Sequence, residues 1–263
     1  ILLGLVDKSL VEAQGDNRFD LHPLIQQYAA AKLAKAEEKD ATQQAHFESF
    51  CTLAHQLKGL YIGPQAITSS RRAEQEFHNF QAALSWGLAN QQSEAVLKLL
   101  HDIFEFWLST GHWQEGERWS VEAVALAAGE DSAHLSLVLC QLAAFRAMQG
   151  RFPEAAAPAQ QAYQMAKRLE DPWPLVHTLQ LQGQSRRDKA GALAAFEEAV
   201  AICREQTGDR RFDTYLSSLL CLQGDRLMNF SLVSEAKLKF EESLARCREL
   251  GDVHYIVYPL GNL

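Results

Sequence analysis

Cysteine is scarce and scattered in this chain of 263 residues. The five cysteines stand singly, and no two of them form a C-x-x-C pair; they are Cys51, Cys140, Cys203, Cys221 and Cys247. An odd number of isolated thiols argues against both a disulfide framework and a zinc knuckle. We therefore expect a reducing, cytoplasmic environment.

Long apolar runs are also missing. No stretch approaches the roughly 20 apolar residues that cross a bilayer, and no signal-peptide pattern opens the chain. We therefore expect no membrane partner. Residues 1–6 are already apolar and carry no initiator Met, which leads us to expect that the chain belongs to a longer protein.

Positive charge is in deficit, with 25 Lys and Arg against 33 Asp and Glu and a formal net charge of -8. This balance opposes a broad phosphate-binding surface. Residues 1–40 alone contain 5 basic against 7 acidic side chains. Nucleic acid is therefore not an expected partner of this chain.

The common catalytic motifs do not occur. The sequence has no G-x-G-x-x-G, G-x-S-x-G or H-E-x-x-H motif. The nearest match to a phosphate-binding loop, residues 111–118, lacks both the Lys and the hydroxyl that ATP and its metal require. We predict no catalytic residue, no metal and no cofactor within this chain.

Two weaker patterns have structural alternatives. Cys51 and His55 share a helix face at four-residue spacing, which suits a metal site or a thiolate pair. The simpler interpretation is that Cys51 is buried in the core and His55 is exposed. Trp107, Trp113 and Trp119 could stack on a ligand, and core packing is again the simpler interpretation.

The only convincing strand signal lies near the start. Residues 10–14 and 18–21 flank the turn residues 15–17, which predicts a β-hairpin. Phe19 and Leu21 alternate with polar residues, so we expect one face of this hairpin to meet a core. Apolar residues 1–5 precede it, and Pro23 suits the first turn of the helix that follows. Helix, hairpin and helix in this order are typical of the wing end of a winged helix-turn-helix.

From residue 37 onward the apolar spacing predicts only helices. Ser69 and Ser70 are the expected cap of a helix that continues through Phe77 to Leu84. Residues 37–92 are therefore predicted to be a helical connector.

Four segments then repeat one pattern of small residues. They begin at Glu115, Glu154, Gly191 and Glu235, at offsets of 39, 37 and 44 residues. Within each segment the second residue is Gly or Ala, the ninth is small, and the last is Ala or Cys. The ninth residues are Ala123, Ala162, Ala199 and Ser243. Small side chains at fixed places let neighbouring helices approach closely, as stacked helical hairpins require.

An apolar helix is predicted before each of these segments, in residues 97–107, 135–148, 175–181 and 215–227. A compressed turn at residues 185–188 explains the shortest offset, and a further helix is expected in residues 253–260. The predicted fold is all-α: a tetratricopeptide-like helical-hairpin solenoid in residues 93–263, preceded by a partial winged helix with a small β-hairpin in residues 1–36. We expect a curved right-handed stack whose first helices line its concave surface.

The first third of the chain resembles a known family. Residues 5–10 and 19–29, followed by residues 74–86, are similar to the end of the winged-helix domain and the adjoining segment in bacterial STAND ATPases, relatives of NB-ARC proteins. The resemblance implies that a longer parent protein binds ATP and ADP in a nucleotide-binding domain outside this chain. The later residues match the group only by their repeat pattern.

In that family a histidine after the wing touches the diphosphate of ADP, and His22 occupies the corresponding position here. Pro23 replaces the acidic residue of eukaryotic relatives, so the resemblance implies only the role of the histidine. A ring N–H near a helix start can donate to a phosphate oxygen. The structural alternative is that His22 merely joins strand to helix.

The leading hypothesis is a non-catalytic sensor fragment of a STAND-type ATPase. Its repeats would bind a partner protein or small inducer, and its winged-helix end would help to hold the nucleotide-bound off state. The alternative is a winged-helix DNA-binding regulator with a helical ligand-binding domain. The sequence assigns no residue to the partner-binding surface.

Overall fold

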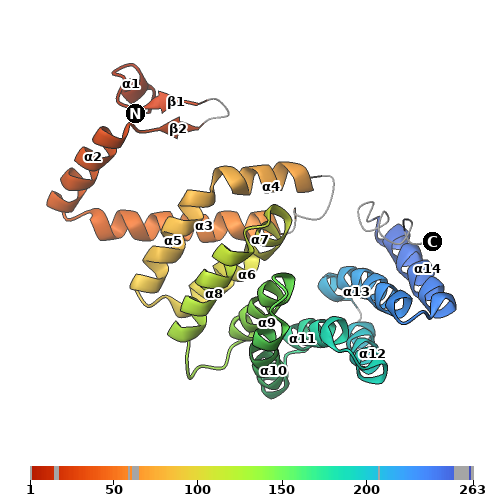
Figure 1. Cartoon of the computed structure of the whole chain (residues 1–263). Coiled ribbons are helices and arrows are strands. Elements are labelled where there is room, and N and C mark those ends of the chain that lie inside the picture. The colour runs from red at the N-terminus through yellow and green to blue at the C-terminus, as the bar shows by residue number, and fades with distance from the viewer. Residues whose placement is uncertain are drawn as a thin grey trace. The chain divides into compact units, whose positions relative to one another are not determined.

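The computed structural model describes residues 2–14, 18–58, 60, 65–206, 208–251 and 261. It divides into two compact units, Ile1–Ser49 and Phe50–Leu263, called unit 1 and unit 2 below. The described residues form fourteen helices and one two-stranded antiparallel sheet (Figure 1). The predicted all-α fold with a small β-hairpin is confirmed. None of the described helices is long and apolar enough to cross a membrane.

Unit 1 contains the predicted hairpin between two helices. Helix α1 (Leu2–Val6) precedes strands β1 (Glu12–Ala13) and β2 (Phe19–Asp20), in which Glu12 lies opposite Asp20 and Ala13 opposite Phe19. Helix α2 (Pro23–Lys35) follows, with Pro in its first turn as expected. The predicted turn at residues 15–17 lies outside the described residues.

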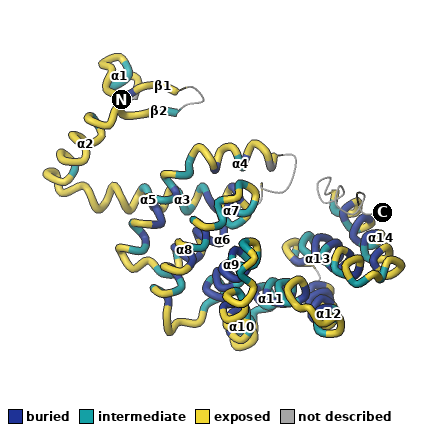
Figure 2. Tube along the Cα trace, viewed as in Figure 1, coloured by how far each residue is buried: buried dark blue, intermediate teal, exposed yellow. Residues whose placement is uncertain are grey.

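The expectation for Leu21 is wrong, because its side chain is 43% exposed. Helix α2 has no buried residue, and Leu24 and Tyr28 on it are exposed as well (Figure 2). Alternation in the hairpin and helical spacing in α2 correctly predicted the elements. These patterns could not show whether another element covers the apolar side chains.

Unit 2 begins within α3 (Lys39–Lys58) and continues through α4 (Ala66–Gln75) and α5 (Phe77–Ala89). The predicted cap at Ser69 and Ser70 is wrong, since both residues lie inside α4. The N–H of Ser69 bonds instead to the carbonyl of Gln65, the true N-cap.

The predicted helix at residues 97–107 is also interrupted. Helix α6 (Ser93–Asp102) ends at Ile103, and α7 (Phe104–Thr110) begins directly after it. No Gly or Pro stands at this break, so the sequence carries no local signal for it. Trp107, from α7, is buried as predicted, as is Trp119 from α8 (Trp113–Leu126). Trp113 is only partly buried, contrary to the core interpretation.

Three helical hairpins follow, as predicted. They pair α9 (Ala133–Met148) with α10 (Phe152–Leu169), α11 (Pro172–Ser185) with α12 (Lys189–Glu205), and α13 (Arg210–Asn229) with α14 (Val233–Leu250). The first helix of each hairpin has a side-chain N-cap, supplied by Ser132, Asp171 and Asp209. Such caps satisfy backbone N–H groups that have no partner within the helix. The predicted helix at residues 253–260 lies outside the described residues.

The prediction for the small repeat positions is confirmed. All four ninth-position residues, Ala123, Ala162, Ala199 and Ser243, are buried. Ser136 in α9 donates to the carbonyl of Ala162 at 2.9 Å, and Ser243 donates to the carbonyl of Ser217 in α13 at 2.7 Å. A larger side chain at these places would separate the two helices of a hairpin.

Glycine in the first helix makes room for phenylalanine in the second. A Cβ atom on Gly183 would lie 2.5 Å from the Phe196 ring, and one on Gly224 would lie 2.5 Å from the Phe240 ring. Both rings are fully buried. The two hairpins therefore close on the same Gly–Phe contact.

Candidate functional site

His22 lies at the N-terminus of α2, where the sequence placed it. Its Nδ1 accepts a hydrogen bond from the backbone N–H of Leu24 at 3.3 Å, so the ring caps the helix. Because Nδ1 accepts, the ring hydrogen is on Nε2, and the side chain is exposed. Capping orients the ring and leaves an N–H group directed elsewhere.

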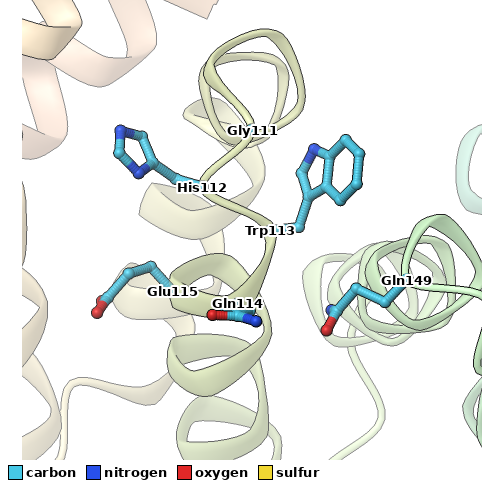
Figure 3. A pocket seen from close by; sticks show the side chains of 6 residues that line it. All are labelled: Gly111, His112, Trp113, Gln114, Glu115 and Gln149. Carbon is cyan, nitrogen blue, oxygen red and sulfur yellow. The ribbon is translucent and has the colours of Figure 1, made fainter.

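A shallow hollow lies over the turn between α7 and α8 (Figure 3). His112 and Trp113 point to opposite sides of this turn, and Gln149 reaches the hollow from the end of α9. The turn is the segment that most nearly matched a phosphate-binding loop. Glu115 contributes a carboxylate, and neither a Lys nor a hydroxyl is among the described residues that line the hollow, so its chemistry is unsuited to phosphate.

A second arrangement of polar groups lies inside unit 2. We call it the histidine cluster: His101 in α6, His134 in α9 and His177 in α11. The ring centroid of His101 lies 6.2 Å from that of His134 and 6.3 Å from that of His177. These three helices contact one another in sequence, which brings together side chains 33 and 43 residues apart.

Hydrogen bonds orient the two inner rings of the cluster. Gln141, also buried, places its amide nitrogen 2.7 Å from Nδ1 of His101. Tyr215 in α13 places its hydroxyl 3.0 Å from Nδ1 of His177 and donates to the Gln180 side chain. In both rings Nε2 is buried and has no hydrogen-bond partner among the described residues.

An ion pair borders the cluster. The Asp102 side chain is 1% exposed and lies 2.9 Å from Nζ of Lys58 and 3.1 Å from Nδ1 of His55. His55 is on the surface, as predicted, but it contacts this buried carboxylate. Cys51, predicted to be buried, is only partly so. A buried carboxylate is stable only when it is paired in this way.

Burial and charge keep both inner histidines neutral. Desolvation, with a smaller contribution from the charge of Lys58, lowers the pKa of His177 from 6.5 to about 3. Desolvation, Lys58 and the two neighbouring histidines lower the pKa of His101 well below its ordinary value. Neutral imidazoles with unused Nε2 atoms are suited to hydrogen bonding with a neutral group. Among the described residues, no group of three or more His, Cys, Asp or Glu is placed to hold a metal ion.

The sequence did not reveal this cluster. The repeat was recognised from the second helices of the hairpins, whereas the histidines lie on the first helices of the array. A search for a polar residue recurring on those first helices would have found His101, His134 and His177. That His101 lies close to the other two rings depends on packing between helices.

No family model matches the chain. Over 215 residues it is 31% identical to proteins of Mycobacterium bovis and Mycobacterium tuberculosis, each named as a candidate HTH-type transcriptional regulator. The match covers 76% of this chain and 24% of each relative. The chain thus spans about a quarter of the length of these relatives, and its similarity is to a portion of a larger regulator.

Proposed function

We propose that this chain is a non-catalytic, ligand-binding portion of a larger transcriptional regulator. The observation that carries this proposal is its similarity, over 76% of its residues, to proteins named as HTH-type regulators. The helical hairpins support it, since stacked hairpins offer extended surfaces to a partner protein or small inducer. It keeps the transcriptional regulator and the helical ligand-binding domain of the second hypothesis drawn from the sequence, but not DNA binding by the winged helix of this chain. The relatives favour it over the ATPase sensor.

Contact with DNA is expected from another part of the longer protein. Residues 1–40 carry an excess of acidic side chains, and phosphate binding requires the opposite sign. In this proposal the hairpin of unit 1 is the wing of a winged helix that transmits the state of the helical array.

The test compares the full-length protein with this chain by fluorescence anisotropy on DNA from upstream of its own reading frame. The full-length protein should bind with a steep salt dependence. The chain alone should bind at least about a thousandfold more weakly, in the range that separates specific from non-specific binding. Equal affinity would place DNA binding within this chain, and absence of binding by the full-length protein would contradict the proposal.

A second candidate is the STAND-type switch, in which the chain helps to hold an ADP-bound off state. The position of His22 favours it: the ring is fixed at the start of α2 through Nδ1 and presents Nε2–H, a donor suited to a diphosphate oxygen. The nucleotide and the domain that binds it would belong to the remainder of the longer protein.

Two substitutions in the full-length protein separate this role from capping. His22→Ala removes both the cap and the donor, whereas His22→Asp keeps a cap and places a negative charge near the diphosphate. Both should release ADP faster than wild type, and His22→Asp should do so without loss of helix stability. ADP release at the wild-type rate in both variants would leave His22 as a cap alone.

A further inference from the structure

The hollow over the α7–α8 turn is large enough for a small molecule. Its volume is about 580 Å³, and ligand sites in proteins usually measure about 300–1,000 Å³. Two rings, a carboxylate and two amides surround Gly111 there; they belong to His112, Trp113, Gln114, Glu115 and Gln149 (Figure 3). What the hollow can bind therefore depends on which hydrogen-bonding groups these side chains leave free.

The N–H groups of both rings are already used within the protein. Nε1 of Trp113 donates to the carbonyl of Leu108 at 3.3 Å. Nε2 of His112 lies 3.4 Å from a carboxylate oxygen of Glu74, and because a carboxylate only accepts, this nitrogen carries the hydrogen. In the neutral ring Nδ1 of His112 is then a further acceptor. The rings offer a ligand an aromatic surface and a lone pair, but no donor.

The side chains of Gln149 and Glu115 also present acceptors. The amide nitrogen of Gln149 donates to Glu117 at 2.9 Å and to the carbonyl of Phe145 at 3.1 Å, which uses both of its hydrogens. The amide oxygen has two lone pairs and accepts only one hydrogen bond from the described residues. Glu115 uses only Oε2 for hydrogen bonds with the described residues, so its Oε1 is free.

Negative charge is in excess beside the hollow. Arg118 pairs with Glu115 at 3.0 Å and with Glu122 at 3.2 Å, so two carboxylates share one positive charge. Neither Lys nor Arg is among the described residues that line the hollow. The backbone N–H groups at the start of α8 would alone favour an anion, but Glu115 brings a negative charge to the same turn.

We propose that this hollow binds a small, elongated organic cation, whose ammonium group donates to Glu115 and whose apolar body lies against Trp113. An ammonium group has three donors and no acceptor, which matches side chains that present acceptors. The face of an indole ring suits an apolar body and also attracts positive charge. The proposal rests on the proposed function, since it gives the chemistry of a ligand for the helical array.

The turn also determines the shape of the ligand. Figure 3 shows Trp113 and Gln149 on one side of the turn and His112 and Glu115 on the other. Gln114 lies between them, is exposed, and forms no side-chain hydrogen bond with the described residues. A ligand that contacts both sides must lie across Gln114, so its charge and its apolar body must be separated by a flexible chain.

The first measurement is calorimetric titration of the wild-type chain with phenylbutylamine, phenylbutanol and phenylbutyrate at neutral pH. These probes share one body and differ in the charge at the end of the chain. The amine should bind in a saturable way, about threefold to tenfold more tightly than the alcohol, as expected for one partly exposed charge-assisted hydrogen bond. The carboxylate should bind most weakly.

Three results of this titration would overturn the proposal. Equal affinity for the three probes would mean that the hollow does not select by charge. Tightest binding of phenylbutyrate would mean that the N–H groups at the start of α8 select an anion. Absence of saturable amine binding at millimolar concentration would mean that the hollow holds only solvent.

A matched pair of variants ties binding to the hollow. Glu115→Gln and Glu122→Gln each remove one carboxylate partner of Arg118, but of the two only Glu115 lines the hollow. Glu115→Gln should weaken amine binding about threefold to tenfold and leave alcohol binding unchanged. Glu122→Gln should change neither. Equal effects of the two variants on amine binding would contradict the proposal.

Trp113→Leu tests the contact with the apolar body. Loss of the ring face should weaken amine binding about twofold to fivefold, and unchanged affinity would show that the ligand does not lie against Trp113. Failure of these tests leaves DNA binding by the full-length protein untouched, so the two proposals can fail separately.

Discussion

Acid should destabilise unit 2 through His177. Its pKa is about 3 in the folded chain, whereas a histidine in an unfolded chain has a pKa near 6.5. Between these values the unfolded chain binds a proton that the folded chain does not. The free energy of unfolding is therefore unaffected by His177 above pH 6.5 and decreases as the pH falls below that value. At pH 5 the loss is about 2 kcal/mol, since one pKa unit corresponds to about 1.36 kcal/mol.

The groups around His177 support this direction. Lys58 is cationic, His101 and His134 are further basic groups, and Tyr215 uses its oxygen to accept from the neutral ring. Asp102 is the nearby carboxylate of the cluster, and it is already paired with Lys58 and His55. Protonated His177 would therefore gain no free counter-charge from these groups.

Urea denaturation at pH 8, 7, 6 and 5 measures the effect. His177→Gln cannot titrate, so its free energy of unfolding should fall by about 2 kcal/mol less than that of wild type between pH 8 and pH 5. Carboxylates contribute equally to both proteins and cancel in the difference. His78→Gln, which removes an exposed histidine of α5, is the matched control and should retain the wild-type pH dependence. An identical pH dependence for wild type and His177→Gln would refute the reasoning.

Three further predictions concern packing and hydrogen bonding. Gly224→Ala should destabilise the chain because its Cβ would meet the Phe240 ring. In a Phe240→Leu background the same change should instead stabilise the chain by about 1 kcal/mol, the helix preference of Ala. Urea denaturation of the four proteins tests this change of sign, and an equal effect in both backgrounds contradicts it. Ala162→Leu should cost about 1–3 kcal/mol by overpacking and lower hydrogen-exchange protection in the repeats more than in residues 1–36; an equal loss in both would indicate one cooperative unit. Glu117→Gln should lower the free energy of unfolding by about 1–3 kcal/mol, because Glu117 accepts from Arg146, Gln149 and Arg151. Desolvation raises the pKa of Glu117, but these hydrogen bonds outweigh it and lower the pKa. An unchanged melting temperature would show that these contacts contribute nothing.

Helical pairing could be predicted from the sequence, because close packing leaves a local trace. Ala162 and Ala199 recur at one position since only a small side chain fits between paired helices, and both are buried. The break at Ile103 could not be predicted, because neither Gly nor Pro marks it. The exposure of Leu21 was missed for a similar reason: a strand pattern shows which face is apolar but not what covers it. The three-part division at residues 36 and 92 stays a prediction.

The histidine cluster was hidden by distance along the chain. His101 and His177 are separated by more than a complete hairpin, and their hydrogen-bonding roles depend on Gln141 and Tyr215 from two further helices. Each of these residues is unremarkable alone. Only their arrangement in the folded chain brings them together.

The short turns of the hairpins also bear on the order in which the chain folds. Because α9 and α10 are joined through residues 149–151 alone, this hairpin can close as soon as α10 has left the ribosome, without a search for distant segments. The hairpins that follow can close in the same way, one after another during synthesis. The histidine cluster cannot, since the ring of His177 is oriented only when Tyr215 has been made. A nascent chain that ends before α13 would therefore contain packed hairpins but an unfinished cluster.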